Sequence, residues 1–258
     1  YRYDGENNWT EVLDLGYTGI WCMQVRDGIL YLGDYNSDTI WRYDGVTAQL
    51  VLDEGRSCIW DFENYNGNLY ASAWLGYLYK SGDGINWNIY STYPYDIGEK
   101  NIWDIEEFRG YLYAGTDAGY YGYNANLYRY DGISSTPVSV WSTPVNYSHE
   151  GILSMETDGI YLYIGMGGDV AYYNSSGIGK VYRYDGANIE LISGTMGSGV
   201  QVLYYVGPTE VTTVNITPPA QEVLSNESFI VNVTVDPAVP IAGVQFDLSF
   251  NSSLVTVN

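Results

Sequence analysis

The sequence is poor in positive charge. Its 258 residues include 10 lysines and arginines against 31 aspartates and glutamates, which gives a formal net charge of −21 at pH 7. No lysine or arginine follows Arg183. Nucleic acids and anionic membrane surfaces are bound through basic patches, so this composition argues against both as partners.

Residues that carry nucleophilic or zinc chemistry are also scarce. The chain has one histidine, His149, and two cysteines, Cys22 and Cys58. This leaves no Ser/His or Cys/His pattern and no zinc-type ligand spacing. No apolar run reaches the roughly 18 residues of a membrane-spanning helix. Because the first residues already form part of a strand pattern, we expect the natural start of the protein to lie upstream of Tyr1.

A short motif recurs along the first two thirds of the chain. It reads aromatic-Arg-Tyr-Asp-Gly at Tyr1–Gly5, Trp41–Gly45, Tyr128–Gly132 and Tyr182–Gly186, with a degenerate copy at Tyr79–Gly84. The aspartates of successive copies are 40, 39, 48 and 54 residues apart. A period of this length indicates an array of supersecondary units, and Asp-Gly after alternating residues predicts a strand that ends in a tight turn.

Each unit contains three further strand patterns. An inner strand starts at Ile20, Ile59, Ile102 and Ile152, a second follows a turn glycine, and a fourth follows the Asp-Gly corner. Four antiparallel strands per unit, without a helical period, predict β-propeller blades over residues 20–54, 58–94, 101–145 and 150–195.

A fifth blade is expected to be split between the two ends of the propeller. Residues 1–14 match the third and fourth strands of a unit, and Gly199–Gly207 matches a second strand. Joining these segments would close the ring and remove exposed sheet edges. The predicted fold is therefore all-β, with a five-bladed propeller over residues 1–207.

Composition changes after Gly207, where tyrosine disappears and Val, Thr, Asn and Pro dominate. Alternating patterns at Val211–Ile216, Phe229–Val235 and Val244–Phe250 predict a sandwich-type domain over residues 208–258. The segments Val214–Pro219, Asn232–Pro237 and Ile241–Phe250 resemble the opening strands of a cohesin-like domain. Only the first part of such a sandwich is covered, so the dockerin binding of that family is not carried over to these residues.

The propeller segment carries a second resemblance. Ser81-Gly82-Asp83-Gly84-Ile85-Asn86-Trp87 is similar to the Asp-box of sialidase-like propellers, and the Tyr-Arg-Tyr-Asp-Gly copies resemble repeats of secreted microbial surface propellers. In Asp-box proteins the aspartate braces a turn and performs no chemistry. The resemblance therefore implies a fold and no activity.

The inner strands place carboxylates where a propeller has its central channel. Simple alternation puts Trp60 and Phe62 on one face of a strand and Asp61 and Glu63 on the other. With Asp104, Glu106 and Glu156, these residues predict an acidic girdle that would suit acid/base chemistry or a hard cation such as Ca²⁺. Hydrogen bonding to backbone and water is the alternative that we favour, so no cofactor is expected, with Ca²⁺ left open.

The 29 tyrosines are the strongest compositional signal. Several aromatic residues fall in the connections that emerge on one face of a propeller, where they would stack on sugars, contact a protein or simply pack within loops. These candidate ligand-binding residues are Tyr17, Tyr35, Trp74, Tyr77, Tyr93, Tyr95, Tyr120, Tyr121, Tyr147, Tyr172 and Tyr173.

Seven Asn-x-Ser/Thr triplets predict glycosylation and an extracellular or cell-surface location. They begin at Asn8, Asn146, Asn174, Asn215, Asn226, Asn232 and Asn251. A disulfide would fit that location, but the repeat alignment displaces Cys58 from Cys22 by three residues, about 10 Å along a strand. We therefore expect two free thiols.

Together these patterns predict a non-catalytic surface propeller that acts in adhesion or assembly. Expected partners are copies of itself, other surface proteins or glycans. Two alternatives stay open: a glycan-processing enzyme that uses the channel carboxylates, and a soluble lectin.

Overall fold

The computed structural model describes residues 1–3, 5, 8–16, 19–35, 37–55, 58–92, 101–117, 124–143, 150–168, 179–194, 200, 203–204, 213–217 and 232–236. The chain divides into two compact units, residues 1–205 and 206–258. Every regular element in the described residues is a strand. Among these residues, no helix is long and apolar enough to cross a membrane.

Four antiparallel four-stranded sheets follow one another along the chain, and they confirm the four predicted complete blades. In each sheet the strands are paired in chain order. The strands are β3 (Ile20–Arg26), β4 (Ile29–Asp34), β5 (Thr39–Tyr43) and β6 (Ala48–Asp53); β7 (Ile59–Tyr65), β8 (Asn68–Ala73), β9 (Tyr77–Ser81) and β10 (Asn88–Thr92); β11 (Ile102–Phe108), β12 (Tyr111–Thr116), β13 (Asn126–Tyr130) and β14 (Val138–Ser142); β15 (Glu150–Thr157), β16 (Leu162–Gly168), β17 (Lys180–Tyr184) and β18 (Ile189–Leu191).

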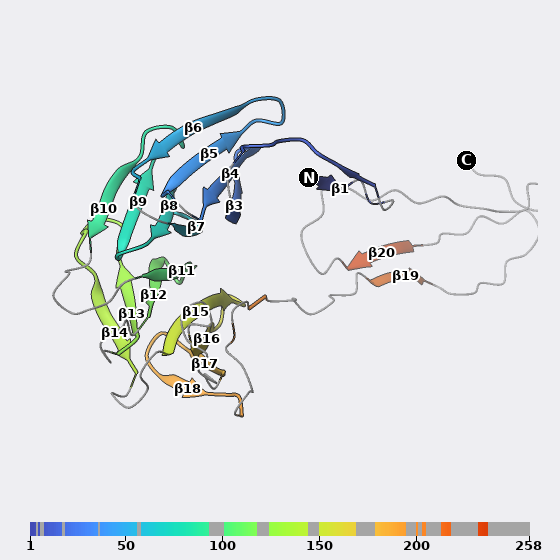
Figure 1. Ribbon diagram of the computed structural model, residues 1–258. Helices are drawn as coiled ribbons and strands as arrows, with labels where there is room; N and C mark the ends of the chain where they lie inside the picture. Colours follow the sequence, from blue (N-terminus) through green and yellow to red (C-terminus); the bar gives the residue numbers. More distant parts are fainter. Residues whose placement is uncertain are drawn as a thin grey trace, which may run out of the picture. The chain divides into compact units, whose positions relative to one another are not determined.

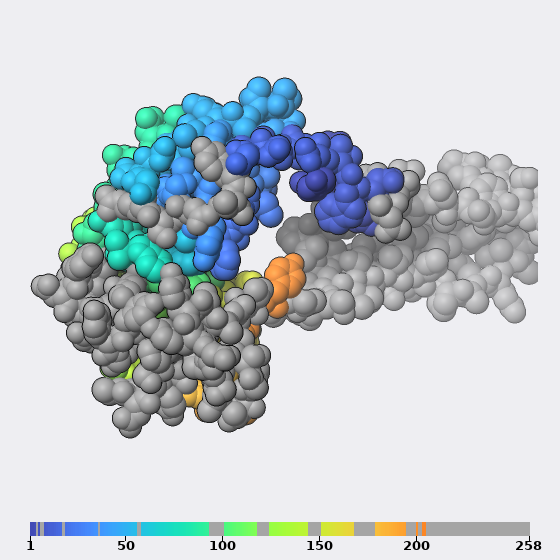
Figure 2. All heavy atoms as spheres, viewed as in Figure 1, coloured from blue at the N-terminus to red at the C-terminus, as the bar shows by residue number. Residues whose placement is uncertain are grey.

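The sheets are arranged as the blades of a β-propeller. The first strand of each sheet, β3, β7, β11 or β15, lies beside the first strand of the next sheet. The four sheets therefore follow a curved path with these inner strands on its concave side (Figure 1). In the space-filling view, the blue and cyan atoms of the first two sheets form one continuous body (Figure 2).

Apolar clusters between neighbouring sheets hold the blades together. One cluster joins Tyr31 and Ile40 of the first sheet to Ile59 and Phe62 of the second. Equivalent clusters join the second sheet to the third and the third to the fourth. Burial of these side chains supplies the main stabilisation of the array, because each sheet is apolar on the faces that meet its neighbours.

A β-bulge interrupts every inner strand, and simple alternation did not predict it. The register shifts between Ile20 and Cys22, and at the equivalent step in β7, β11 and β15. In β7, Ile59 pairs with Ala73 and Phe62 with Ala71, so Ile59 shares the face of Phe62. The extra residue of the bulge is Trp21, Trp60, Trp103 or Leu153. The prediction that Trp60 and Phe62 lie on the same face of the strand is therefore wrong, because a bulge shifts the alternation by one residue.

The repeated aspartate closes the turn between the third and fourth strands. Asp44 Oδ1 accepts the backbone N–H groups of Val46 and Thr47, at 2.8 and 2.7 Å. The same two hydrogen bonds recur at Asp83, Asp131 and Asp185. The following Gly45 has a φ of 95°, which other residues rarely adopt. The motif is therefore a structural turn.

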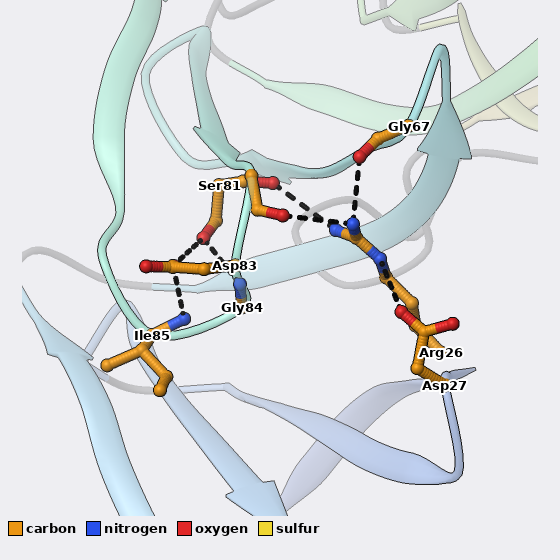
Figure 3. Close-up of polar contacts among 8 residues, drawn as sticks. Arg26, Asp27, Gly67, Ser81, Asp83, Gly84 and Ile85 are labelled. Atoms are coloured by element: carbon orange, nitrogen blue, oxygen red, sulfur yellow. Dashed lines mark hydrogen bonds and ion pairs between the residues drawn. The ribbon is translucent and has the colours of Figure 1, made fainter.

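An arginine locks the first blade to the turns of the second. Arg26, at the end of β3, donates from Nη2 to the carbonyl oxygens of Gly67 and Gly82, at 2.8 and 3.0 Å, and from Nη1 to that of Ser81 at 3.4 Å (Figure 3). Tyr65 ends β7 at the equivalent place and donates its hydroxyl to the carbonyl oxygen of Gly110, at 2.9 Å. Both contacts join an inner strand to the turn that follows the next inner strand.

One described residue after the fourth sheet contacts the fourth blade. We expected Gly199–Gly207 to form the second strand of a blade. A Cβ added to Gly115 would meet Ile152, the residue that begins the bulged step of the next inner strand, and a Cβ added to Gly165 would meet Val200 in the same way. Val200 therefore lies beside Gly165 as Ile152 lies beside Gly115. Apart from Val200, Leu203 and Tyr204, the segment lies outside the described residues, so its place in a blade stays a prediction.

Two short hairpins complete the described residues. In residues 1–205, β1 (Arg2–Tyr3) pairs with β2 (Trp9–Thr10), and the hydroxyl of Tyr43 donates to the carbonyl oxygen of Val12 at 3.4 Å. In residues 206–258, β19 (Thr213–Thr217) pairs with β20 (Asn232–Asp236), and each overlaps one of the three predicted strands. The third predicted strand, Val244–Phe250, lies outside the described residues.

Candidate functional site

The bulges gather aromatic side chains where the inner strands begin. Trp60 lies at the centre of this aromatic cluster, with ring centroids 5.4 Å from Trp21, 6.2 Å from Tyr35, 6.3 Å from Trp74 and 4.2 Å from Trp103. Trp21 also stacks on Tyr35, with centroids 5.2 Å apart and an interplanar angle of 29°. Such pairs add about 0.5–1.5 kcal/mol each beyond buried area, so the rings hold one another in place.

The cluster is buried at its centre and open at one edge. Trp60 is 5% exposed, whereas Trp21 is 53% and Tyr35 is 37% exposed. The exposed, stacked pair therefore presents two rigid aromatic faces in the first blade, supported from below by Trp60. This is the arrangement by which aromatic side chains contact the apolar face of a sugar ring or of another flat ligand.

Backbone contacts between blades fix the outer members of the cluster. Tyr35 and Trp74 follow the second strands β4 and β8. The Cys58 thiol donates to the carbonyl oxygen of Tyr35, and Trp74 forms a β-bridge with Asn101 of the next blade. The end of each second strand is thus tied to the start of the next inner strand, which places these rings beside the bulged tryptophans.

Polar side chains border the cluster on the third blade. Asp117, which follows β12, takes the place that Tyr35 and Trp74 occupy in the first two blades. Its Oδ2 accepts from Asn101 Nδ2 at 2.6 Å and from Trp103 Nε1 at 3.3 Å. Asn101 and Asp117 are 3% and 8% exposed. The cluster therefore changes from aromatic to polar between the second and third blades.

Two of the predicted channel carboxylates bind the backbone of the next blade. Asp61 Oδ2 accepts the N–H of Ile105 at 3.1 Å, and Asp104 accepts the N–H of Met155. Ser154 continues the series by donating its hydroxyl to the carbonyl oxygen of Val200, at 3.1 Å. The hydrogen bonds of Asp61 and Asp104 are therefore structural links between inner strands, and the chemical role of these carboxyl groups stays a prediction.

The carboxyl groups of β7 and β11 are difficult to ionise. Burial raises the pKa of Asp61 to about 7 and that of Glu63 to about 8. Burial, and next the charge of Glu63, raise the pKa of Glu106 to about 9, and burial raises that of Asp104 well above its usual range. The largest cause in each case is the loss of water around the carboxylate, and at Glu63, Asp104 and Glu106 neighbouring carboxylates add repulsion.

These carboxyl groups have the chemistry of proton donors and acceptors near neutral pH. No group of three or more metal-ligating side chains is found among the described residues, and Ca²⁺ binding stays a prediction. Both cysteines are free thiols, and Cys22 donates to the carbonyl oxygen of Ile59 at 3.5 Å. Burial raises the pKa of the Cys22 thiol well above its usual range, which makes it a poor nucleophile.

Of the predicted ligand-binding aromatic residues, the structure brings Tyr35 and Trp74 into the cluster. Tyr77 instead stacks on Tyr79 within β9, with centroids 6.1 Å apart. The other predicted members lie outside the described residues: Tyr17, Tyr93, Tyr95, Tyr120, Tyr121, Tyr147, Tyr172 and Tyr173. Among the predicted glycosylation sites, Asn8 is exposed, Asn215 and Asn232 lie in β19 and β20, and Asn146, Asn174, Asn226 and Asn251 lie outside the described residues.

Five residues of the site were not predicted from the sequence: Trp21, Trp60, Trp103, Asn101 and Asp117. Two repeated features of the sequence could have indicated the cluster. Three inner strands begin with Ile-Trp, and an aromatic residue or an aspartate follows the second strand of the same blades. Alternation assigned these tryptophans to the packed face, and only the bulge directs them elsewhere.

No protein-family model and no curated protein matches this sequence. Among solved structures, the extracellular domain of a putative one-component system from B. thetaiotaomicron has 14% identity and a TM-score of 0.57. The match covers 80% of this chain and 27% of that chain. This similarity is one of fold.

Two carbohydrate-active enzymes are more distant. The GH43 endo-arabinanase from Bacillus licheniformis has 14% identity and a TM-score of 0.45, covering 69% of this chain and 77% of that chain. The endo-arabinase from Bacteroides thetaiotaomicron has 9% identity and a TM-score of 0.43, covering 86% and 94%. Scores at this level carry no information about the activity of the present protein.

Proposed function

We propose that this protein is a non-catalytic, carbohydrate-binding propeller of an extracellular or cell-surface protein. The observation that carries the proposal is the aromatic cluster, in which exposed Trp21 and Tyr35 stack at 5.2 Å and rest on buried Trp60. Rigid aromatic faces beside the polar Asn101 and Asp117 provide both kinds of contact that a sugar ring needs.

Substitution of the exposed tryptophan tests this proposal. The wild-type protein is titrated with cellohexaose, maltohexaose and mannohexaose, and we expect Trp21→Ala to weaken the binding of the recognised sugar by tenfold or more, as loss of a stacking platform implies. Trp9→Ala is the matched control, because Trp9 is 66% exposed on β2 and contacts only Tyr3 among the described aromatic rings. Equal affinities of the Trp21→Ala and Trp9→Ala variants would reject the aromatic cluster as the binding site.

Glycan cleavage is the second candidate, favoured by the carboxyl groups whose pKa values lie near 7 to 9. A protonated carboxyl near neutral pH is what a general acid requires. We instead expect no release of reducing sugar from any hexasaccharide, and unchanged affinity in the Asp61→Asn, Asp104→Asn double variant. Turnover that either single substitution abolishes would replace the binding proposal with an enzymatic one.

The finer architecture belongs to the same proposal. A five-bladed ring, closed by residues near both ends of the propeller, would carry a cohesin-like sandwich that links copies of the protein or other surface proteins. The net charge of −21 opposes such contacts at low ionic strength, so Ca²⁺ or salt would promote them. Light scattering across salt and Ca²⁺ concentrations tests this, and a constant monomer mass would contradict it.

A further inference from the structure

We infer that Trp60 and Asn101 form a polar subsite, at the junction of the second and third blades, that recognises adjacent hydroxyl groups of a neutral sugar. This inference rests on the proposed carbohydrate binding and adds to it the class of sugar and the residues that select it. It concerns atoms beneath the exposed aromatic pair.

Two buried polar atoms of the aromatic cluster have no hydrogen-bond partner among the described residues. They are Trp60 Nε1 and Asn101 Oδ1, each with less than 1 Å² of accessible surface. Burying a donor or an acceptor without a partner is unfavourable, and most such groups in proteins are paired. Two of them in one cluster, beside an exposed aromatic platform, indicate that their partners come from a ligand.

The free atoms define the chemistry of that ligand. Asn101 Nδ2 and Trp103 Nε1 both donate to Asp117 Oδ2, which orients the Asn101 amide so that its Oδ1 remains the free acceptor. Trp60 Nε1 is a donor only, whereas a carbonyl oxygen is an acceptor only. A pair of adjacent sugar hydroxyls satisfies both atoms, because each hydroxyl donates and accepts.

The surroundings select against a charged sugar. Asp117 borders the subsite, and Asp104 lies three residues after Asn101 with its own Oδ1 buried and without a partner in the described part of the chain. Neither Trp60 nor Asn101 contacts a lysine or arginine through any hydrogen bond or ring contact found in the described residues. A uronic or sialic acid would therefore place its negative charge beside the Asp117 carboxylate, with no cation among these contacts to balance it.

Entry of the sugar requires movement of one ring. Both free atoms are covered in the structure, and the half-buried Trp103 lies over Trp60 with centroids 4.2 Å apart. Displacement of the Trp103 ring would uncover the subsite while Trp21 and Tyr35 hold the neighbouring sugar unit. Binding is therefore expected to change tryptophan fluorescence.

The test compares chemically matched variants of the full chain. Trp60→Phe removes the N–H and keeps an aromatic ring, and Trp87→Phe is the control. Trp87 Nε1 is also buried and unpaired in the described part of the chain, but Trp87 contacts Tyr31 and Phe62 away from the cluster. With the neutral hexasaccharide that binds the wild type, we expect about a tenfold loss of affinity for Trp60→Phe and no change for Trp87→Phe.

Asn101→Ala gives an independent measurement if Trp60→Phe does not fold, with the same expected loss. Hexagalacturonic acid should not bind. If Trp21→Ala weakens binding but Trp60→Phe and Asn101→Ala do not, the subsite is rejected and the proposed function stands. Binding of hexagalacturonic acid as tightly as the neutral sugar also rejects the subsite, and absence of binding by every neutral hexasaccharide rejects both proposals.

Discussion

Removal of the Arg26 guanidinium should loosen the contact between the first two blades. The side chain is 18% exposed and donates to three carbonyl oxygens of the second blade, at 2.8, 3.0 and 3.4 Å. Its ion pair with Asp27, whose side chain is 87% exposed, contributes at most about 1 kcal/mol. Hydrogen bonds from a charged group contribute roughly 1.5–3 kcal/mol, and the third bond is long, so we expect Arg26→Met to cost about 2–3 kcal/mol.

Thermal unfolding followed by tryptophan fluorescence measures this cost. For a unit of this size a loss of about 2–3 kcal/mol lowers the midpoint by roughly 5–10 °C. Arg183→Met is the matched control, because Arg183 pairs with Glu190 at 2.8 Å and the two side chains are 37% and 62% exposed. Such exposed pairs contribute little to stability because solvent screens them. Equal shifts for the two variants would refute the argument that backbone carbonyls of the next blade make Arg26 special.

Three further predictions concern pH and packing. Backbone hydrogen bonds hold the pKa values of Asp44, Asp131 and Asp185 below their usual range. The stability that these carboxylates contribute is therefore present above about pH 4 and is lost as the pH falls through their folded-state pKa values. On acid titration, Asp131→Asn should lose less stability than the wild type. The pKa values of Glu63 and Glu106 are raised, to about 8 and 9, so their effect on stability has the opposite sign. The thermal unfolding midpoint should decrease as the pH rises from 5 to 9, and Glu106→Gln should make this decrease smaller. A midpoint that increases over this pH range would contradict the assignment. Gly115→Ala should cost about 1–3 kcal/mol in chemical denaturation, since its Cβ would lie 2.3 Å from Ile152 Cγ2, whereas Gly19→Ala meets nothing within 4 Å and should be tolerated.

The period of the Asp-Gly corners was sufficient to predict the blades. Each Asp closes its turn with local backbone hydrogen bonds, so the signal and its structural cause lie within the same few residues. The strand boundaries followed from the same corners and from the turn glycines. Local chemistry of this kind can be seen in one sequence without knowledge of the contacts between blades.

The bulges and the cluster they create were not predictable in this way. A bulge inserts one residue into a strand without a Gly or Pro to mark it, and its effect depends on the partner strand. In β7 the register places Ile59 on the same face as Phe62 and leaves Trp60 as the extra residue of the bulge. The sequence of this strand nevertheless reads as an uninterrupted alternation. Likewise, the position of Val200 depends on its contact with Gly165, a residue 35 positions away in the sequence.

The repeat itself explains why the aromatic cluster forms where the inner strands begin. The bulged position holds Trp21, Trp60, Trp103 and Leu153 in successive blades. The bulge is therefore present in every one of these blades, while the side chain at its extra residue changes. The position after the second strand holds Tyr35, Trp74 and then Asp117, and the backbone N–H of each donates to the residue just before the inner strand of its own blade, Gly19, Cys58 or Asn101.

Equivalent backbone positions therefore present rings in the first two blades and hydrogen-bonding groups at the third. Because the scaffold at each position is the same, substitutions there alter the chemistry of the surface while leaving blade packing intact. An exchange of Asp117 for tryptophan, its counterpart in the second blade, would extend the aromatic face and free Asn101 Nδ2 and Trp103 Nε1 from their shared acceptor. Under the proposed function, selectivity for hydroxyl groups would then fall while stacking remained, because the stacking rings and the hydrogen-bonding groups come from different blades.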